Sequence, residues 1–304
     1  MAFFNLSFVS VVVALVACCW ISFRHQPVRY TKDNSDDFVR RYGDWAIVAG
    51  ASEGLGAAWA SELCGLGVNV LLVARRENEI KKVANYLQSK YPKILVDTLV
   101  QDLSAANLQE VFYSVINGNE RKYGLLIYNA AHSIIGPFID SSLEIQHKTV
   151  DVNVRGVLTL CHVLSNHIRA RTGEGGIILM SSLSGELGTA GISNYAGTKA
   201  WNTAFAHGLS HELSPLGIDV MACVAGPVTT PNYIKASIQE GRNNVIEQTA
   251  EEVVSECIQA IGSHSSIRTG FVNKISRFFV MRLLLMEMAI RVFNEEAAKV
   301  LKSS

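Results

Sequence analysis

Tyr195 and Lys199 pair a phenol with an ammonium group at a spacing of four residues, with small residues compatible with a helix between them. In a helix the two side chains would project from one face, one turn apart. A lysine cation close to a phenol favours the ionised phenolate, and each unit of lowered pKa corresponds to about 1.4 kcal/mol. The pair therefore predicts that Tyr195 donates or accepts a proton near neutral pH. So short a pattern also recurs by chance as an ordinary pair on a helix surface.

A glycine-rich turn, Gly50-x-x-x-Gly54-x-Gly56, follows an apolar strand expected at residues 45–49 and opens a helix that continues through Leu63. Glycines let the backbone approach a pyrophosphate closely, and the helix N-terminus supplies unpaired amides and the positive end of a dipole. The alternative is a tight turn without a ligand. The order of strand, turn and helix favours dinucleotide binding.

Two arginines, Arg75 and Arg76, follow Ala74 at the end of the second expected strand. An NAD enzyme commonly carries an acidic residue there, which binds the ribose hydroxyls. An arginine can instead pair with the adenosine phosphate of NADPH through two hydrogen bonds. The arginines therefore predict NADP(H) as the coenzyme. The alternative is a solvated basic pair at a helix start, because nearby Glu53 adds no attraction for phosphate.

Short, nearly continuously apolar runs alternate with helical stretches along the chain. Strands are expected at residues 45–49, 68–74, 94–100, 125–128, 177–180 and 219–224. Helices are expected at residues 80–88, 143–171 and 195–213. Three more are expected: one from the glycine-rich turn to residue 63, one from a Ser104 cap to residue 116, and one that follows a capping box at 249–252. This alternation is typical of a parallel sheet buried on both faces. The sequence therefore predicts an α/β protein with a doubly wound parallel sheet, whose strand-end loops hold the ligand.

The composition narrows the class of protein. The chain has 304 residues, of which 49% are hydrophobic and 18% are charged, so it can bury a sizeable core. Lys and Arg together number 27, as do Asp and Glu, and this balance gives no indication of a nucleic-acid partner. The eight histidines show no metal-ligand spacing, so no metal site is predicted.

Residues 1–23 contain no charged side chain and are long enough to cross a bilayer as a helix. A membrane anchor is the leading interpretation. The alternatives are a cleavable signal peptide, a lipoprotein box at 15–18 and a buried core helix, but no basic residue precedes the apolar run. Four basic residues lie between 24 and 32, which predicts that the catalytic part faces the cytosol. Residues 24–43 are expected to form a linker that ends in a polar connector at 33–43.

The C-terminal residues 271–304 form an apolar and basic tail that is expected to be helical, after a catalytic domain at 44–270. Residues 277–291 of the tail are apolar with regularly interspersed charges, too charged to span a bilayer comfortably. The tail could lie in the membrane interface and shape a hydrophobic entrance. It could equally be a core or dimer helix whose arginines reach solvent.

Five features, in their order along the chain, resemble the short-chain dehydrogenase/reductase family. They are the glycine-rich turn, Asn129-Ala130, Asn153, Ser182 and Tyr195-x-x-x-Lys199. The resemblance covers about residues 44 to 232 and implies a Rossmann fold in a single domain, preceded here by the expected membrane helix. The glycine-rich sequence, the arginine pair and the apolar N-terminus are most similar to the branch of hydroxysteroid dehydrogenases and long-chain 3-ketoacyl-CoA reductases.

The resemblance implies a role for each of the four catalytic candidates. Tyr195 would protonate a carbonyl oxygen as hydride arrives, or act as the base in the reverse direction. Lys199 would lower the pKa of that tyrosine and hold the nicotinamide ribose. Ser182 would bind the substrate oxygen by a hydrogen bond, and Asn153 would support a water-linked proton path. Taken alone, Ser182 could be a helix-capping serine and Asn153 an amide on a helix surface.

The resemblance also implies the residues that contact the coenzyme. They are Gly50, Ser52, Glu53, Gly54, Leu55, Gly56, Arg75, Arg76, Asp102, Leu103, Asn129, Ala130, Tyr195, Lys199, Pro227, Val228 and Thr230. Asp102 and Leu103 would flank the adenine, and the segment from Pro227 to Thr230 would cover the nicotinamide. Three residues depart from the family pattern, namely Ala49, Tyr128 and Ala131. These departures put some local hydrogen bonds between the first and fourth strands in doubt.

The sequence thus predicts a membrane-anchored, NADP(H)-dependent oxidoreductase that interconverts a ketone and a secondary alcohol. By the resemblance, the substrate is lipophilic: a fatty acyl, steroid, retinoid or sphingoid compound. The resemblance also implies the endoplasmic reticulum membrane, and a homodimer or tetramer paired through the helices at 143–171 and 195–213. One alternative is an oxidative steroid or retinol dehydrogenase. Another is a non-catalytic, dinucleotide-binding membrane scaffold, since a fold does not by itself establish a function.

Overall fold

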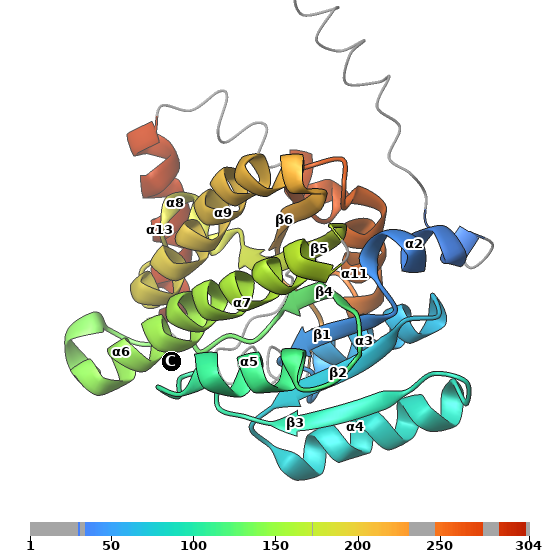
Figure 1. The fold of residues 1–304 in the computed structure, drawn as a ribbon. Coiled ribbons are helices and arrows are strands. Elements are labelled where there is room, and N and C mark those ends of the chain that lie inside the picture. The colour runs from blue at the N-terminus through green and yellow to red at the C-terminus, as the bar shows by residue number, and fades with distance from the viewer. Residues whose placement is uncertain (1–29, 31–33, 172, 231–246, 276–285, 302–304) are drawn as a thin grey trace, which may run out of the picture.

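The computed structural model describes residues 30, 34–171, 173–230, 247–275 and 286–301 (Figure 1). Within these residues seven parallel strands form one sheet, in the order β3-β2-β1-β4-β5-β6-β7. The strands are β1 (Trp45–Ala49), β2 (Asn69–Ala74), β3 (Val96–Val100), β4 (Tyr123–Tyr128), β5 (Gly175–Ser182), β6 (Ile218–Ala225) and β7 (Ser266–Arg268). The chain winds outward from β1 in one direction and then from β4 in the other. The predicted doubly wound parallel sheet is therefore confirmed, and only the three-residue β7 is an addition to the expected strands.

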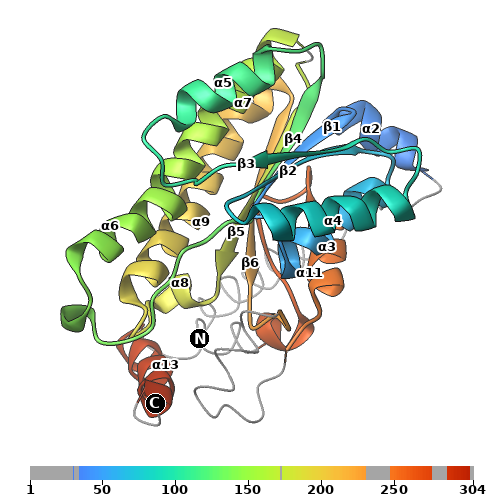
Figure 2. The same cartoon turned by 90° about the horizontal axis from the view of Figure 1, so that it is seen from below.

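Helices cover both faces of the sheet, so that Figures 1 and 2 show three layers. One face is covered by α3 (Gly54–Gly65), α4 (Glu77–Lys90) and α11 (Ala250–Ala260), and the other by α5 (Leu108–Asn117), α7 (Gly156–Arg171) and α9 (Ser193–Leu213). Alternate residues of each central strand point to opposite faces. Val48 packs in the core beneath the first group of helices, whereas Ile47 and Ala49 pack beneath the second. Both faces are therefore buried, which explains the continuously apolar strands.

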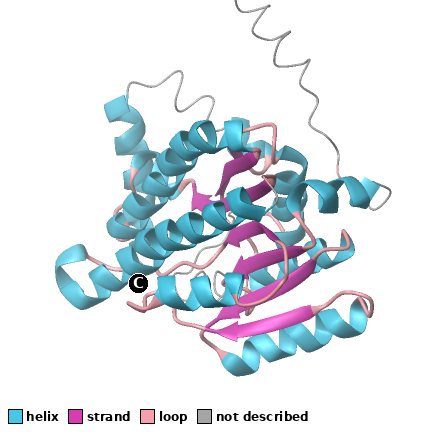
Figure 3. Ribbon diagram, viewed as in Figure 1, coloured by secondary structure: helices cyan, strands magenta, loops and turns pink. Residues whose placement is uncertain are grey.

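The parallel arrangement gathers the carboxyl ends of the strands at one edge of the sheet (Figure 3). The glycine-rich turn follows β1, Asn129 follows β4, and Ser182 ends β5. Gly226 and Pro227 follow β6 at the same edge. Residues far apart in sequence therefore meet where this fold class binds its ligands.

The segment predicted to be a polar connector contains a helix instead. Residues Ser35–Tyr42 form α2, whose Phe38 and Tyr42 are buried in the core. These two aromatic residues lie on one helix face because they are four residues apart. Arg41 fixes the helix to the start of β6 by an ion pair of 2.7 Å with Asp219. The two aromatic residues were too few to reveal this helix within a short, charged stretch.

The single helix predicted at 143–171 is interrupted. It consists of α6 (Leu143–Val150), a π-helical turn (Asp151–Arg155) and α7. A π-helical turn inserts one extra residue without ending the helix, and such turns occur frequently at functional sites. A hydrophobic periodicity of 3.6 residues does not reveal a single inserted residue.

Ser104 does not cap the following helix, which begins at Leu108. Its backbone N–H and its Oγ both donate to Asp102 Oδ1, at 2.9 and 2.7 Å. Ser104 therefore closes a turn after β3, as short polar residues often do. The capping box predicted at Thr249 and Glu252 is confirmed at the start of α11.

The predicted membrane anchor at 1–23 lies outside the described residues, as does most of 24–33. In the part of the chain that the structure describes, none of the helices has both the length and the apolar character that a bilayer crossing requires. The described part of the C-terminal tail includes α13 (Met286–Leu301), while residues 276–285 lie outside. Helix α13 lies against the short helix α8 (Ser184–Leu187). Its Asn294 Oδ1 accepts a 2.8 Å hydrogen bond from the Ala190 amide.

Candidate active site

Ser182, Tyr195 and Lys199 meet at the carboxyl edge of the sheet. Ser182 ends β5, while Tyr195 and Lys199 lie in the first turns of α9. Ser182 lies close enough to Tyr195 for its side chain to act on the pKa of the phenol. Lys199 Nζ lies 5.5 Å from the centroid of the Tyr195 ring. The structure therefore brings together three of the four side chains that the resemblance implies for catalysis.

Lys199 is almost completely buried, with 2% of its surface exposed. Its Nζ donates a 2.6 Å hydrogen bond to the carbonyl oxygen of Met180 on β5. Burial disfavours the charged ammonium and lowers the pKa of Lys199 to about 8, although the nearby Cys223 acts in the opposite direction. The ammonium is thus held at a fixed position between α9 and β5.

The pKa of Tyr195 is raised, which is the reverse of the net shift expected from its lysine neighbour. Burial of the phenol raises the pKa, and the hydrogen bond from Ser182 lowers it by a smaller amount. The free-energy cost of removing a phenolate from water is larger than the free energy gained from one hydrogen bond. The group that favours the phenolate is Ser182, while the Lys199 ammonium is directed to the Met180 carbonyl.

Asn153 lies in the π-helical turn and is fully buried. Its Oδ1 accepts from the His132 amide at 2.8 Å, and its Nδ2 donates to the His132 carbonyl at 2.9 Å. The same Nδ2 donates to Thr198 Oγ1 at 3.0 Å. Asn153 is therefore an internal link between the loop after β4 and the helix that carries Tyr195, and the alternative of a surface amide is excluded. The two partner residues, His132 and Thr198, were not predicted from the sequence.

The glycine-rich turn requires its glycines. Gly50 has a φ of +86°, and a Cβ there would lie 2.6 Å from the Cα of Ala130. A Cβ on Gly56 would lie only 2.0 Å from the Gly50 carbonyl oxygen. Asn129 holds the turn by donating from Nδ2 to that oxygen at 2.9 Å. The close backbone approach at Gly50 and Gly56, next to the N-terminus of α3, is the arrangement that holds a pyrophosphate.

The two arginines have different surroundings. Arg76 Nη2 lies 2.6 Å from Glu53 Oε1 and 2.9 Å from Ser52 Oγ, so Arg76 is bound to the glycine-rich turn. Arg75 is more loosely placed, with its Nη1 4.0 Å from Asp102 Oδ2 and 55% of its side chain exposed. The side chains of both arginines are about half exposed, and Arg75 is the one with the longer ion-pair distance.

Asp102 lies between two basic side chains. Lys148 Nζ of α6 is 3.9 Å from Asp102 Oδ2, on which Arg75 also converges. Burial alone would raise the pKa of Asp102, but hydrogen bonds from Ser104 and these two cations hold it below its usual range. Leu103, its predicted companion at the adenine, is buried.

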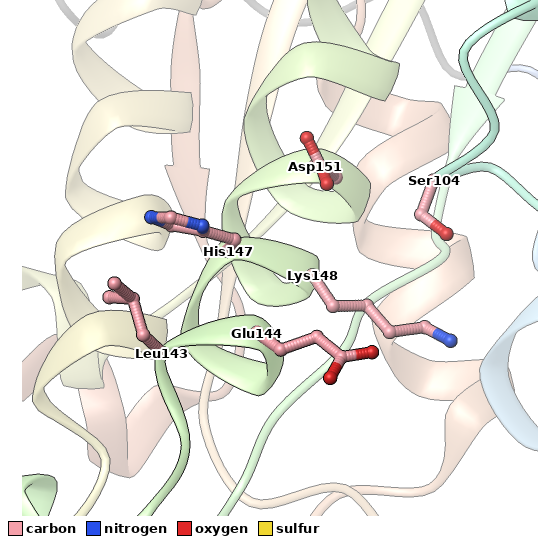
Figure 4. Close-up of a pocket in the computed structure, with 6 residues that line it drawn as sticks. All are labelled: Ser104, Leu143, Glu144, His147, Lys148 and Asp151. Carbon is pink, nitrogen blue, oxygen red and sulfur yellow. The ribbon is translucent and has the colours of Figure 1, made fainter.

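A polar hollow of about 510 Å³ adjoins this carboxylate (Figure 4). It is lined by Ser104, Leu143, Glu144, His147, Lys148 and Asp151. Figure 4 shows Ser104 on the loop after β3 and the other five side chains on α6 and the turn that follows. The hollow thus adjoins the predicted adenine end of the site, since Ser104 and Lys148 also lie against Asp102. Neither Lys148 nor this hollow was predicted from the sequence.

The loop after β6 is fixed at its base. Val228 forms an isolated parallel bridge with Gln248 and is 8% exposed. Gln248 N donates to the Pro227 carbonyl at 3.1 Å, and Thr229 N donates to the Gln248 carbonyl at 2.9 Å. Thr230 is partly buried at the end of this stretch. The predicted nicotinamide-covering residues therefore lie at the same sheet edge as Ser182, and residues 231–246 lie outside the described part.

The departures from the family pattern leave the central strands joined. The carbonyl oxygen of Ala49 accepts from the amides of Asn129 and Ala130, at 2.9 and 2.8 Å. Tyr128 directs its hydroxyl to the Val152 carbonyl in the π-helical turn, at 2.6 Å. The backbone hydrogen bonds that join the end of β1 to the residues after β4 are therefore present despite these departures.

Comparison with known proteins identifies the family to which the chain belongs. The model of the short chain dehydrogenase family matches residues 44–242. A very-long-chain 3-oxoacyl-CoA reductase of Podospora anserina is 33% identical over 199 residues, which cover 63% of this chain but only 58% of the reductase. A solved 7beta-hydroxysteroid dehydrogenase has a TM-score of 0.76 at 24% identity, covering 84% of this chain and 98% of that one.

A second solved structure is a short-chain dehydrogenase from Sphingobium yanoikuyae in complex with NADPH. Its TM-score is 0.66 at 24% identity, and the match covers 80% of this chain and 95% of that one. At these identities the two structures establish the fold, whereas the family model establishes the relationship. The chain belongs to the short-chain dehydrogenases, a family of NAD(P)-dependent oxidoreductases that act on hydroxyl and keto groups.

Proposed function

We propose that this protein reduces a ketone on a lipophilic substrate to a secondary alcohol with NADPH. The observation that carries the proposal is the convergence of Ser182, Tyr195 and Lys199 beside the glycine-rich cradle. The cradle alone would support nucleotide binding. A proton donor linked to a second hydroxyl and accompanied by a buried ammonium supports a reaction at a carbonyl.

The residues present fit NADP(H). The cradle formed by Gly50, Gly54 and Gly56 would hold the pyrophosphate against the N-terminus of α3. Arg75 would pair with the adenosine phosphate, and Arg76 would keep the turn in place through Glu53. The predicted adenine contacts and nicotinamide cover lie along the same sheet edge. When bound, the coenzyme supplies the hydride.

The protein's own groups would manage the proton and the developing charge. Tyr195 donates its proton to the carbonyl oxygen, and Ser182 donates a hydrogen bond to that same oxygen. Lys199, fixed by Met180, offers further N–H donors to the ribose. Asn153 holds the loop that follows β4 against helix α9. It also supports the water-linked path that returns a proton to Tyr195.

The lipophilic substrate is supported by the relatives, whose names specify a very-long-chain 3-oxoacyl-CoA and a hydroxysteroid. Both carry a keto or hydroxyl group on a large apolar body. A fatty acyl or steroid ketone is the best-supported class, with retinoid and sphingoid ketones of the same chemical type. Because the physiological direction depends on the state of the coenzyme pool, oxidation of a steroid or retinol is the reverse of the same reaction.

The test is oxidation of NADPH by the full-length, detergent-solubilised protein. Substrates would be 3-oxoacyl-CoA esters of increasing chain length and a set of steroid ketones, with NADH in parallel. Tyr195→Phe should abolish turnover while retaining NADPH binding. Tyr113→Phe is the matched control, because that phenol is 63% exposed on α5. Equal turnover by Tyr195→Phe and the unmodified protein would overturn the mechanism, and saturable NADPH binding without turnover would favour the scaffold.

The proposal includes attachment to the endoplasmic reticulum membrane by residues 1–23, with the catalytic domain in the cytosol. It rests on the uncharged N-terminal run and the basic residues after it. Extraction at alkaline pH, and protease digestion of sealed microsomes, would test attachment and orientation. Light scattering of the purified protein would test the expected dimer or tetramer.

A further inference from the structure

Ser184 places a second hydroxyl beside the serine assigned to the substrate oxygen. Its Oγ donates a 3.0 Å hydrogen bond to Ser182 Oγ, and its backbone N–H lies 3.3 Å from the same oxygen. A hydroxyl has two acceptor lone pairs and one proton. Because Ser184 supplies donors for both lone pairs, the Ser182 proton is directed elsewhere, towards Tyr195 and the substrate oxygen.

The direction of a hydrogen bond between Ser182 and Tyr195 matters for proton transfer. When Ser182 donates to the Tyr195 oxygen, the ionised phenol is favoured and its pKa falls. The opposite direction, in which Ser182 accepts the Tyr195 proton, would stabilise the neutral phenol and turn its proton away from the carbonyl. Donation from Ser184 occupies the lone pair that this unproductive direction requires.

The local backbone holds Ser184 at this position. Its carbonyl oxygen accepts a 3.2 Å hydrogen bond from Thr189 Oγ1 across the following turn. The next residue, Gly185, is pressed against α9, because a Cβ there would lie 2.6 Å from the Ala200 amide nitrogen. The α8 turn therefore rests directly on the helix that carries Tyr195, and the spacing between the two serines is fixed by backbone contacts.

We propose that Ser184 is a positioning residue of the reaction, whose hydroxyl keeps Ser182 oriented as a hydrogen-bond donor to the substrate oxygen. This inference rests on the proposed reduction of a carbonyl. A donor that is oriented before the reaction need not reorganise as charge develops on the oxygen. A hydroxyl that itself receives a hydrogen bond is also a stronger donor. Among the residues that the structure describes, the charged side chain that lies against the Tyr195 ring is that of Lys199, which is on the same helix.

The test compares Ser184→Ala, Ser184→Thr and Thr189→Val in the full-length protein. Ser184→Ala should lower kcat about tenfold with an unchanged KM for NADPH, because the lost bond acts on the oxygen in the transition state. Ser184→Thr keeps a hydroxyl at the same position and should restore most of kcat. Thr189→Val removes a hydrogen bond that holds this turn but keeps both serine hydroxyls, so it shows how much of the effect comes from loosening the turn rather than from losing the hydroxyl.

A second readout is independent of turnover. With ¹³C-labelled tyrosines, the Tyr195 signal, assigned with Tyr195→Phe, should titrate at higher pH in Ser184→Ala than in the unmodified protein and Ser184→Thr. An unchanged titration, together with a kcat within twofold of the unmodified protein, would overturn the role of Ser184. If the unmodified protein reduces no ketone, the proposed function fails, and the titration alone then decides whether Ser184 orients Ser182.

Discussion

The Tyr128 hydroxyl donates a 2.6 Å hydrogen bond to the Val152 carbonyl oxygen, joining the end of β4 to the π-helical turn. In an α-helix this carbonyl would accept from the Gly156 amide. Here that amide bonds to the Asp151 carbonyl instead. A Cβ on Gly156 would lie 2.3 Å from the Tyr128 oxygen, so tyrosine and glycine are matched in size. The phenol thus supports the turn that carries Asn153.

Tyr128→Phe should lower the free energy of unfolding by about 1 to 3 kcal/mol, because a buried carbonyl loses its donor. It should also reduce kcat, since Asn153 is held by the same turn. Urea denaturation and initial rates would measure the two effects. Tyr113→Phe, at an exposed position, should change stability by no more than about 0.5 kcal/mol. Equal stability of the two variants would refute the structural role of the Tyr128 hydroxyl.

Gly56→Ala should weaken NADPH binding at least about tenfold, since its methyl group would displace the Gly50 carbonyl from the cradle. The matched control is Gly208→Ala in α9, where a Cβ would meet no atom within 4 Å. That variant should gain about 0.5 to 1 kcal/mol of stability from helix propensity. Fluorescence titration with NADPH and thermal unfolding would separate the two outcomes. Unweakened binding by Gly56→Ala would show that the turn does not contact the pyrophosphate.

Arg75→Ala should lower the affinity for NADPH about tenfold and leave that for NADH nearly unchanged, because its half-exposed guanidinium is only loosely paired with Asp102 and can pair with the extra phosphate. Arg76→Ala should affect both coenzymes, because Arg76 holds the turn through Glu53 and Ser52. Dissociation constants for the two coenzymes would distinguish these patterns. A selective loss of NADPH binding in Arg76→Ala alone would reverse the assignment.

Stability should depend on pH through Lys199. Its pKa is about 8 in the folded protein against 10.5 for an ordinary lysine, so between these values the unfolded chain binds the extra proton. Stability therefore rises with pH across this window, by an amount on the order of 3 kcal/mol. Below pH 8 both states are protonated and the full cost of burying the charge is present. Lys199→Met should remove this rise in urea denaturation measured from pH 7 to 10, and an identical pH dependence in both proteins would contradict it.

The strands were predictable because each is a short apolar run between turn residues, and a parallel sheet buried on both faces produces that pattern. The elements that differed depend on contacts between distant residues. Helix α2 is stabilised by packing of Phe38 and Tyr42 and by the pair between Arg41 and Asp219, which is far away in sequence. The π-helical turn depends likewise on Tyr128. Neither kind of contact leaves a local periodic signal.

The sequence by itself determined the doubly wound fold and the residue types at the strand ends, because hydrophobic periodicity and glycine spacing are local properties. The family resemblance of its motifs implied Ser182, Tyr195 and Lys199 as catalytic residues. Only the tertiary structure decided how these groups are used. Burial rather than the lysine charge sets the pKa of Tyr195, the glycine-rich turn binds Arg76, and Ser184 lies against Ser182. Desolvation and hydrogen-bond direction depend on every atom around a group, and those atoms come from segments that meet only when the chain folds.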